Sequence, residues 1–131
     1  VTYYKFGRHS YHYTEVYAGL LTDHASLRLY YSPSYFGEEL KTVYTDLNMG
    51  AALPAEPRVR VFGHLGALTP VGGARYPGSR RERYDMSAGL AARVRSSELS
   101  VSLTKTTPQP PNPYLRSLET SSVVVGASYF F

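Results

Sequence analysis

The chain has no cysteine and no tryptophan, and only three of its 131 residues are lysine. Without cysteine, neither a disulfide framework nor a thiolate metal site can form. The net charge is +4, but there is no lysine-rich run or helical basic stripe of the kind that binds nucleic acid. No apolar run approaches the roughly 18 residues of a membrane helix. These absences argue against a disulfide-rich domain, a nucleic-acid partner and a helical membrane protein.

Tyrosine and alternating patterns are abundant instead. Aromatic residues make up 14% of the chain, with 13 tyrosines and five phenylalanines. Tyrosine suits places where one end of a side chain is dry and the other wet, such as a membrane interface. Apolar residues recur with period two along most of the chain, and helical periodicity is scarce. The sequence therefore predicts an all-β protein, and its length fits a single domain over residues 1–131.

Eight strands are expected, with alternate side chains on opposite faces. In most of them, every second residue is alanine, valine or leucine, and the residues between are polar or charged. Their approximate bounds are Val1–Gly7, Tyr13–Leu21, Ala25–Tyr31, Thr42–Leu53, Arg58–Leu68, Arg83–Val94, Glu98–Lys105 and Ser121–Phe131.

The connections between these strands alternate in length. The longer ones follow the first, third, fifth and seventh strands, at residues 8–12, 32–41, 69–82 and 106–118. The shorter ones are residues 22–24, 54–57 and 95–97. Outer-membrane barrels have long loops outside and short turns on the periplasmic side. The pattern predicts an antiparallel, up-and-down transmembrane β-barrel with about eight strands.

The last stretch, Ser121–Phe131, is apolar to its final residue. One parity holds valines, an alanine and two aromatic residues, Tyr129 and Phe131. Soluble domains usually have polar, frayed termini, whereas outer-membrane barrels commonly end in a strand with a terminal phenylalanine. We expect Tyr129 and Phe131 to belong to the strand that closes the barrel.

The two faces of the expected strands lead to a side-chain assignment. Acidic and basic groups can fill a narrow lumen by pairing, whereas a soluble barrel would hold its apolar face inside. The residues expected to face the lumen are Glu15, Arg28, Asp46, Asn48, Arg58, Arg60, His64, Arg83, Asp85 and Arg93. Those expected to face lipid are Val16, Leu27, Leu29, Leu47, Val59, Val61, Leu65, Leu90, Val101, Val123 and Val125.

The width of the barrel decides what the basic residues of the fifth strand would do. In an eight-strand barrel, side chains fill the interior. Arg58, Arg60 and His64 are then expected to plug it together with the carboxylates of the neighbouring strands, Glu15, Asp46 and Asp85. In a wider barrel the same basic residues would form an anion path.

Two segments resemble a known family. Glu15–Leu20 (EVYAGL) and Leu29–Gly37 (LYYSPSYFG) are similar to the paired-strand signature of the TorF family, porin-like outer-membrane barrels of Gram-negative bacteria. The closing Tyr129–Phe131 is similar to the end of these proteins. Family members have further strands before the signature, so the chain would correspond to their C-terminal portion. The resemblance implies a barrel of eight strands or a part of a wider one, and it contributes no catalytic residue.

Other candidate sites are few. His9 and His12 are a histidine pair without an evident third ligand, so a solvated loop is expected there and no metal site. Arg80, Arg81 and Arg83 form a basic cluster suited either to lipopolysaccharide phosphates or to a solvated loop. No phosphate loop or nucleophile elbow is present, so we expect no catalytic residues and no cofactor.

The sequence thus predicts a non-enzymatic outer-membrane barrel that acts as a porin or as a structural membrane component. Its expected partners are the lipid bilayer and lipopolysaccharide. The chain begins at Val1 without a signal peptide, as a processed protein or a fragment would. One alternative is a soluble periplasmic β-barrel that binds a small apolar ligand. Another is an interaction module whose loops, Ser32–Lys41 or Thr106–Leu118, engage a partner protein.

Overall fold

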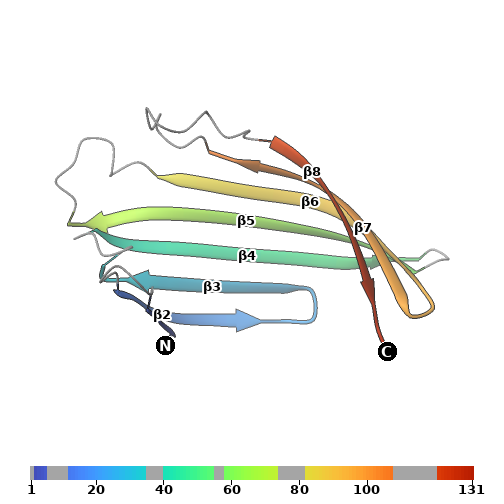
Figure 1. The fold of residues 1–131 in the computed structure, drawn as a ribbon, viewed down its shortest axis with the longest axis horizontal. Coiled ribbons are helices and arrows are strands. Elements are labelled where there is room, and N and C mark those ends of the chain that lie inside the picture. Colours follow the sequence, from blue (N-terminus) through green and yellow to red (C-terminus); the bar gives the residue numbers. More distant parts are fainter. Residues whose placement is uncertain (1, 6–11, 35–39, 55–57, 74–81, 108–120) are drawn as a thin grey trace.

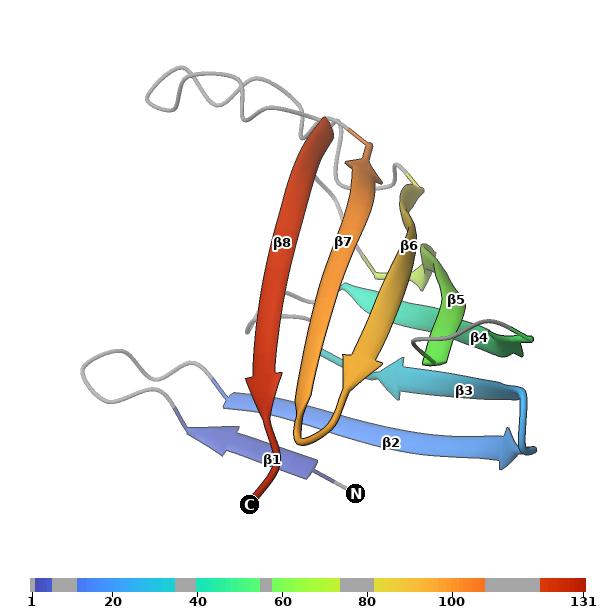
Figure 2. The ribbon, with the colours of Figure 1, turned by 90° about the vertical axis from the view of Figure 1, so that its right-hand side faces the viewer.

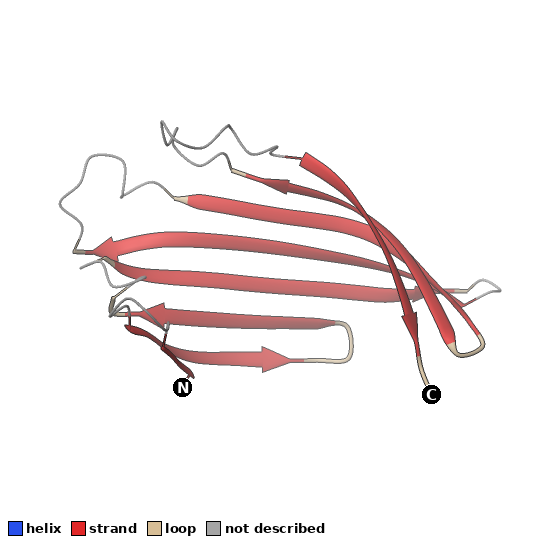
Figure 3. Ribbon diagram, viewed as in Figure 1, coloured by secondary structure: helices blue, strands red, loops and turns tan. Residues whose placement is uncertain are grey.

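The computed structural model describes residues 2–5, 12–34, 40–54, 58–73, 82–107 and 121–131 (Figure 1). These residues form strands joined by turns and loops, without a helix (Figure 3). The strands are β1 (Thr2–Lys5), β2 (His12–Leu21), β3 (Ala25–Ser32), β4 (Lys41–Leu53), β5 (Arg58–Gly72), β6 (Arg83–Val94), β7 (Ser97–Thr106) and β8 (Ser121–Tyr129). No helix within these ranges is long and apolar enough to cross a membrane.

The observed strands confirm the period-two prediction. β6 has the predicted bounds, and β2, β3, β4 and β7 differ from prediction by one residue at one or both ends. β5 is the main exception, since it continues to Gly72 through a segment predicted to be a loop. Pro70 is accommodated there because the pairing with β4 shifts register beside it, between Lys41 and Thr42.

Each strand pairs with the next in an antiparallel, up-and-down order. β2 to β8 form a continuous sheet, and β1 adds four pairs along the first residues of β2. The sheet curves, with β6, β7 and β8 standing steeply relative to β2 and β3 (Figure 2).

Of the predicted fold, the antiparallel, up-and-down sheet is confirmed, whereas the described strands are not closed into a barrel. β1 and β8 are not paired with each other, so the sheet is open. The expected barrel-closing end at Tyr129 and Phe131 therefore has no neighbouring strand on its outer side within the described chain. To close the barrel, β8 would have to pair with another strand in matching register. In the described structure, the four paired residues of β1 all pair with β2.

The short connections are closed by local hydrogen bonds. Thr22 donates its backbone N–H to the Ala25 carbonyl at 2.8 Å, and its hydroxyl accepts the Ala25 N–H at 3.0 Å. Arg95 has a φ of 53°, the left-handed conformation that a two-residue hairpin turn demands. Phe130 then donates its N–H to the Ser96 carbonyl at 2.7 Å, which attaches the C-terminus to this turn.

This one-layer sheet has almost no hydrophobic core. Leu40 and Ala91 are the only buried apolar side chains within the described ranges. Large apolar side chains lie exposed along β2 to β8 instead, among them Leu103 at 66% and Val125 at 77%. A sheet with one apolar face normally buries that face against another layer, and the described chain supplies no such layer.

Candidate functional site

The cross-strand register sorts the predicted residues into two faces. A polar face contains every residue predicted to face the lumen, and an apolar face contains every residue predicted to face lipid. The row Leu27–Leu47–Leu65–Met86 runs straight across four strands of the apolar face. The grouping of side chains was thus predictable, whereas what each face contacts remains a prediction.

In a soluble protein, the apolar side chains of a strand are shielded and the polar ones are exposed. Along β6 and β7 the alternation is reversed. In β6, Asp85 and Ser87 are partly shielded, while Met86 and Leu90 are exposed. β7 repeats the pattern, with its serines partly shielded and its leucines and Val101 exposed. The more closely packed side of this part of the sheet is therefore the polar one.

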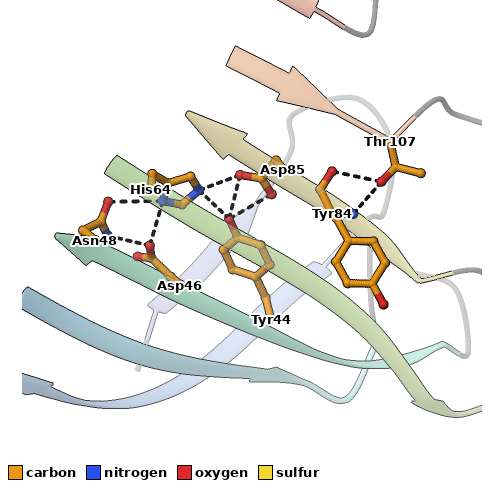
Figure 4. A network of polar contacts seen from close by, with 7 residues as sticks. All are labelled: Tyr44, Asp46, Asn48, His64, Tyr84, Asp85 and Thr107. Atoms are coloured by element: carbon orange, nitrogen blue, oxygen red, sulfur yellow. Dashed lines mark hydrogen bonds and ion pairs between the residues drawn. The ribbon is translucent and has the colours of Figure 1, made fainter. Parts of the chain in front are cut away.

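A hydrogen-bonded cluster occupies the middle of the polar face (Figure 4). His64 of β5 lies between two carboxylates, with Nδ1 at 3.2 Å from Asp46 Oδ1 and Nε2 at 2.5 Å from Asp85 Oδ1. Asn48 completes the group, because its Oδ1 lies 3.1 Å from His64 Nδ1 and its Nδ2 donates to Asp46 at 2.6 Å. Tyr44 donates its hydroxyl to Asp85 at 3.2 Å.

The bond between Tyr44 and Asp85 joins two strands that are not neighbours. Gly66 of β5 lies between Asp46 and Asp85 in the register. A Cβ at Gly66 would collide with the Asp85 carboxylate and with the Tyr44 hydroxyl. The missing side chain is therefore what allows β4 and β6 to bond across β5.

Tyrosines extend this cluster toward the first strands. Tyr17, Tyr30 and Tyr44 lie in one register row of β2, β3 and β4. Their ring centroids are 5.4 Å apart between Tyr17 and Tyr30, and 6.1 Å apart between Tyr30 and Tyr44. These are ordinary distances for aromatic pairs, so the row forms a continuous aromatic ladder across three strands.

Beside the ladder and the cluster, the polar face is hollowed. The hollow has a volume of about 400 Å³ and is lined by Glu15, Tyr30, Tyr44, Asp46, Asn48 and His64. Its walls combine aromatic rings with hydrogen-bonding groups and two carboxylates.

Arg60 and Arg93 lie closer to the short turns. Arg60 contacts Glu98 of β7 through two hydrogen bonds, from Nη2 at 2.8 Å and from Nε at 3.3 Å. Arg93 places its guanidinium over the Phe130 ring, 4.6 Å from the centroid. Ala91 of β6 is 1% exposed and lies between Arg60 of β5 and Ser100 of β7 in the register.

The structure brings together some of the residues predicted to plug a narrow barrel and gives others different partners. His64 does lie with Asp46 and Asp85. Arg60 instead pairs with Glu98, which was absent from the predicted set. Glu98 alternates along β7 with the same spacing as Ser100 and Ser102, and this spacing indicates in the sequence that Glu98 lies on the polar face. Arg58 lies opposite Arg93 and forms no ion pair with a described residue.

The side chains of the cluster that could ligate a metal are His64, Asp46 and Asp85. Both ring nitrogens of His64 contact protein oxygens. No group of histidine, cysteine and acidic residues suited to a metal ion occurs in the part of the chain that is described. His9, Arg80 and Arg81 lie outside the described residues, and of the predicted basic cluster only Arg83 is placed, on the polar face of β6.

Comparison with known proteins leaves the family open. No family model, no curated protein and no solved structure matches the chain. The resemblance to the TorF family therefore stays a prediction from the sequence, and the function has to be argued from the two faces of the sheet.

Proposed function

We propose that the protein is a non-enzymatic outer-membrane β-barrel component whose apolar face meets lipid and whose polar face lines the interior. The reversed exposure along β6 and β7 is the observation that carries this proposal. An exposed apolar face of this extent is unfavourable in water and favourable in a bilayer. Outer-membrane barrels alternate between apolar residues outward and polar residues inward.

Aromatic residues at the strand ends support a membrane location. On the apolar face, Tyr31 and Tyr84 lie near the long loops, and Tyr129 lies near the short turns. Ten residue steps separate Tyr84 from Val94 in β6, which is about 33 Å along a strand. At a tilt of about 40° this gives roughly 25 Å, the height of the apolar band of outer-membrane barrels.

The stagger of the strands also supports a barrel. The register row that passes through Leu21, at the end of β2, reaches Ser122, near the start of β8. Barrels combine strand tilt with a fixed stagger of this kind. The open edges of β1 and β8 would then be joined to each other, or to further strands in a wider barrel. A wider barrel would leave room for solute transport as a porin, with the polar face lining the channel.

The first test is gel mobility of boiled and unboiled protein folded in detergent, with circular dichroism alongside. We expect a heat-modifiable band and a strong β signal. A folded, monodisperse monomer in plain buffer, with no shift on heating, would contradict the proposal and support the soluble ligand-binding alternative.

For folded protein, conductance in a planar bilayer then separates a pore from a closed structural barrel. A non-conducting barrel would rule out the porin form.

A further inference from the structure

A second hollow lies on the apolar face, between β5 and β8. It has a volume of about 740 Å³, within the usual range for small-molecule sites. Two adjacent register rows form most of its lining. One row runs Leu65–Met86–Lys105–Ser121, and the next includes Ala88, Leu103 and Val123. Small side chains at Ala88 and Ser121 leave space between the larger ones.

One end of this apolar groove is positively charged. Lys105 lies near the end of β7 that leads into the long connection, and it shares the parity of Leu103 and Val101. Its side chain is exposed, and it forms no ion pair with any residue that the structure describes. Ser121 lies directly opposite Lys105 in the register and adds a hydroxyl donor at the same end.

The charge of Lys105 differs in its position from the charges of the arginines in the sheet. The arginines of β3, β5 and β6 belong to the polar face, where Arg60 and Arg93 have protein partners. A lysine on a lipid-facing surface can extend its amino group toward the aqueous interface while its methylenes stay on apolar surface. At Lys105 the amino group would therefore lie at headgroup level, with an apolar groove beside it.

From this juxtaposition we infer that the groove binds one acidic phospholipid, whose phosphate headgroup has a net negative charge, in preference to a zwitterionic one. An acyl chain lies along Leu65, Met86 and Leu103, and the phosphate accepts hydrogen bonds from Lys105 and Ser121. The chain contributes apolar burial, and the phosphate neutralises the lone ammonium group. The inference rests on the proposed membrane location, and it adds a lipid of defined chemistry at a defined place.

The test uses the full chain reconstituted in phosphatidylcholine nanodiscs. Spin-labelled phosphatidic acid is compared with spin-labelled phosphatidylcholine, and the motionally restricted fraction gives their relative association constants. We expect phosphatidic acid to be preferred about fivefold, the factor that corresponds to roughly 1 kcal/mol per basic residue near a membrane surface. Lys105→Gln should bring the preference close to one.

Two further variants make the result specific to the groove. Lys41→Gln removes another exposed lysine near the long loops, outside the groove, and should leave the preference unchanged. Ala88→Phe fills the groove on an already exposed apolar position and should lower the association of phosphatidic acid. Equal losses with Lys41→Gln and Lys105→Gln would mean diffuse surface charge and would overturn the inference.

Failure of the inference and failure of the proposed function have different signatures. Protein that enters nanodiscs and shows no preference for phosphatidic acid would overturn the lipid site alone. Retention of the full preference in Ala88→Phe would also overturn it, because the chain would then lie elsewhere. Protein that stays in the aqueous fraction would overturn the membrane location, and the lipid site with it.

Discussion

The two faces of this sheet differ in how their side chains are held. On the polar face, side chains bond across neighbouring strands and even over an intervening strand, as Tyr44 and Asp85 do above Gly66. On the apolar face, large side chains are exposed, for example Leu90 at 47% and Val125 at 77%. The polar face is thus organised by contacts within the chain, whereas the described residues leave the apolar face uncovered. Substitutions on the two faces should therefore respond differently to the presence of a bilayer.

The largest effect is expected from a charge at the centre of the apolar face. Leu90 lies in the row Val61–Leu90–Val101–Val125. Leu90→Arg should cost about 2–4 kcal/mol of folding free energy in vesicles, because a charge near the bilayer midplane is poorly solvated. Urea titration in phosphatidylcholine vesicles measures this cost, and Val61→Arg is expected to behave in the same way.

The matched change on the opposite face is Arg60→Leu. It should be far milder, because Arg60 is half exposed and its bond to Glu98 is the only ion pair that it forms with a described residue. Equal losses for Leu90→Arg and Arg60→Leu would show that the inward and outward assignment is wrong.

A smaller effect is expected from filling the gap in the polar cluster. Gly66→Ala should destabilise the folded protein by about 0.5–1.5 kcal/mol, because the added methyl group pushes the ends of the Asp85 and Tyr44 side chains apart and disrupts their hydrogen bond. Gly63→Ala is the control in the same strand. The nearest atom to its new Cβ would be the Ser87 carbonyl oxygen at an ordinary 3.5 Å. The free energies of unfolding of the two variants in detergent should differ. Equal values would contradict the crowding of side chains on the polar face.

Removing a single hydroxyl tests the bond over Gly66. Tyr44→Phe should cost about 0.5–1.5 kcal/mol, the usual net value of one hydrogen bond. The difference should become smaller in an Asp85→Ala background, because the long contact to His64 Nε2 at 3.5 Å is then the only one left of the hydroxyl contacts described here. A double-mutant cycle from unfolding free energies measures this coupling. Additive losses would mean that the two side chains do not interact.

The smallest effect is expected at the edge of the polar face. Glu98→Gln removes the charge that binds Arg60, in a pair whose arginine is 49% exposed. The loss should shrink further as salt is added, since exposed pairs are screened. Comparing unfolding midpoints at low and high ionic strength checks this. A loss of stability that does not depend on salt would indicate that the Arg60–Glu98 pair is shielded from solvent. The polar face would then enclose a narrower space than the open sheet does.

Much of the fold was predictable because strand periodicity is a local property. The bounds of β6, and the common face of Val61 and Leu90, follow from residue order alone, since alternate side chains point to opposite sides. The extension of β5 through Pro70 was missed, because proline normally marks a turn and only the register shift against β4 accommodates it.

The pairing of polar side chains was less predictable. The sequence indicated that His64 would lie with Asp46 and Asp85, because all three alternate with the polar residues of three adjacent strands. It could not indicate that Arg60 would reach Glu98 across β6. That contact depends on the stagger between β5 and β7 and on the small Ala91 between them.

The sequence by itself therefore determined the strands, their up-and-down order and the division of side chains between two faces. Each of these follows from period two and short turns, which act over a few residues. Only the tertiary structure decided that the sheet stays open between β1 and β8, and which side chains meet across it. Curvature and stagger accumulate over all the strands, and no local pattern specifies their sum.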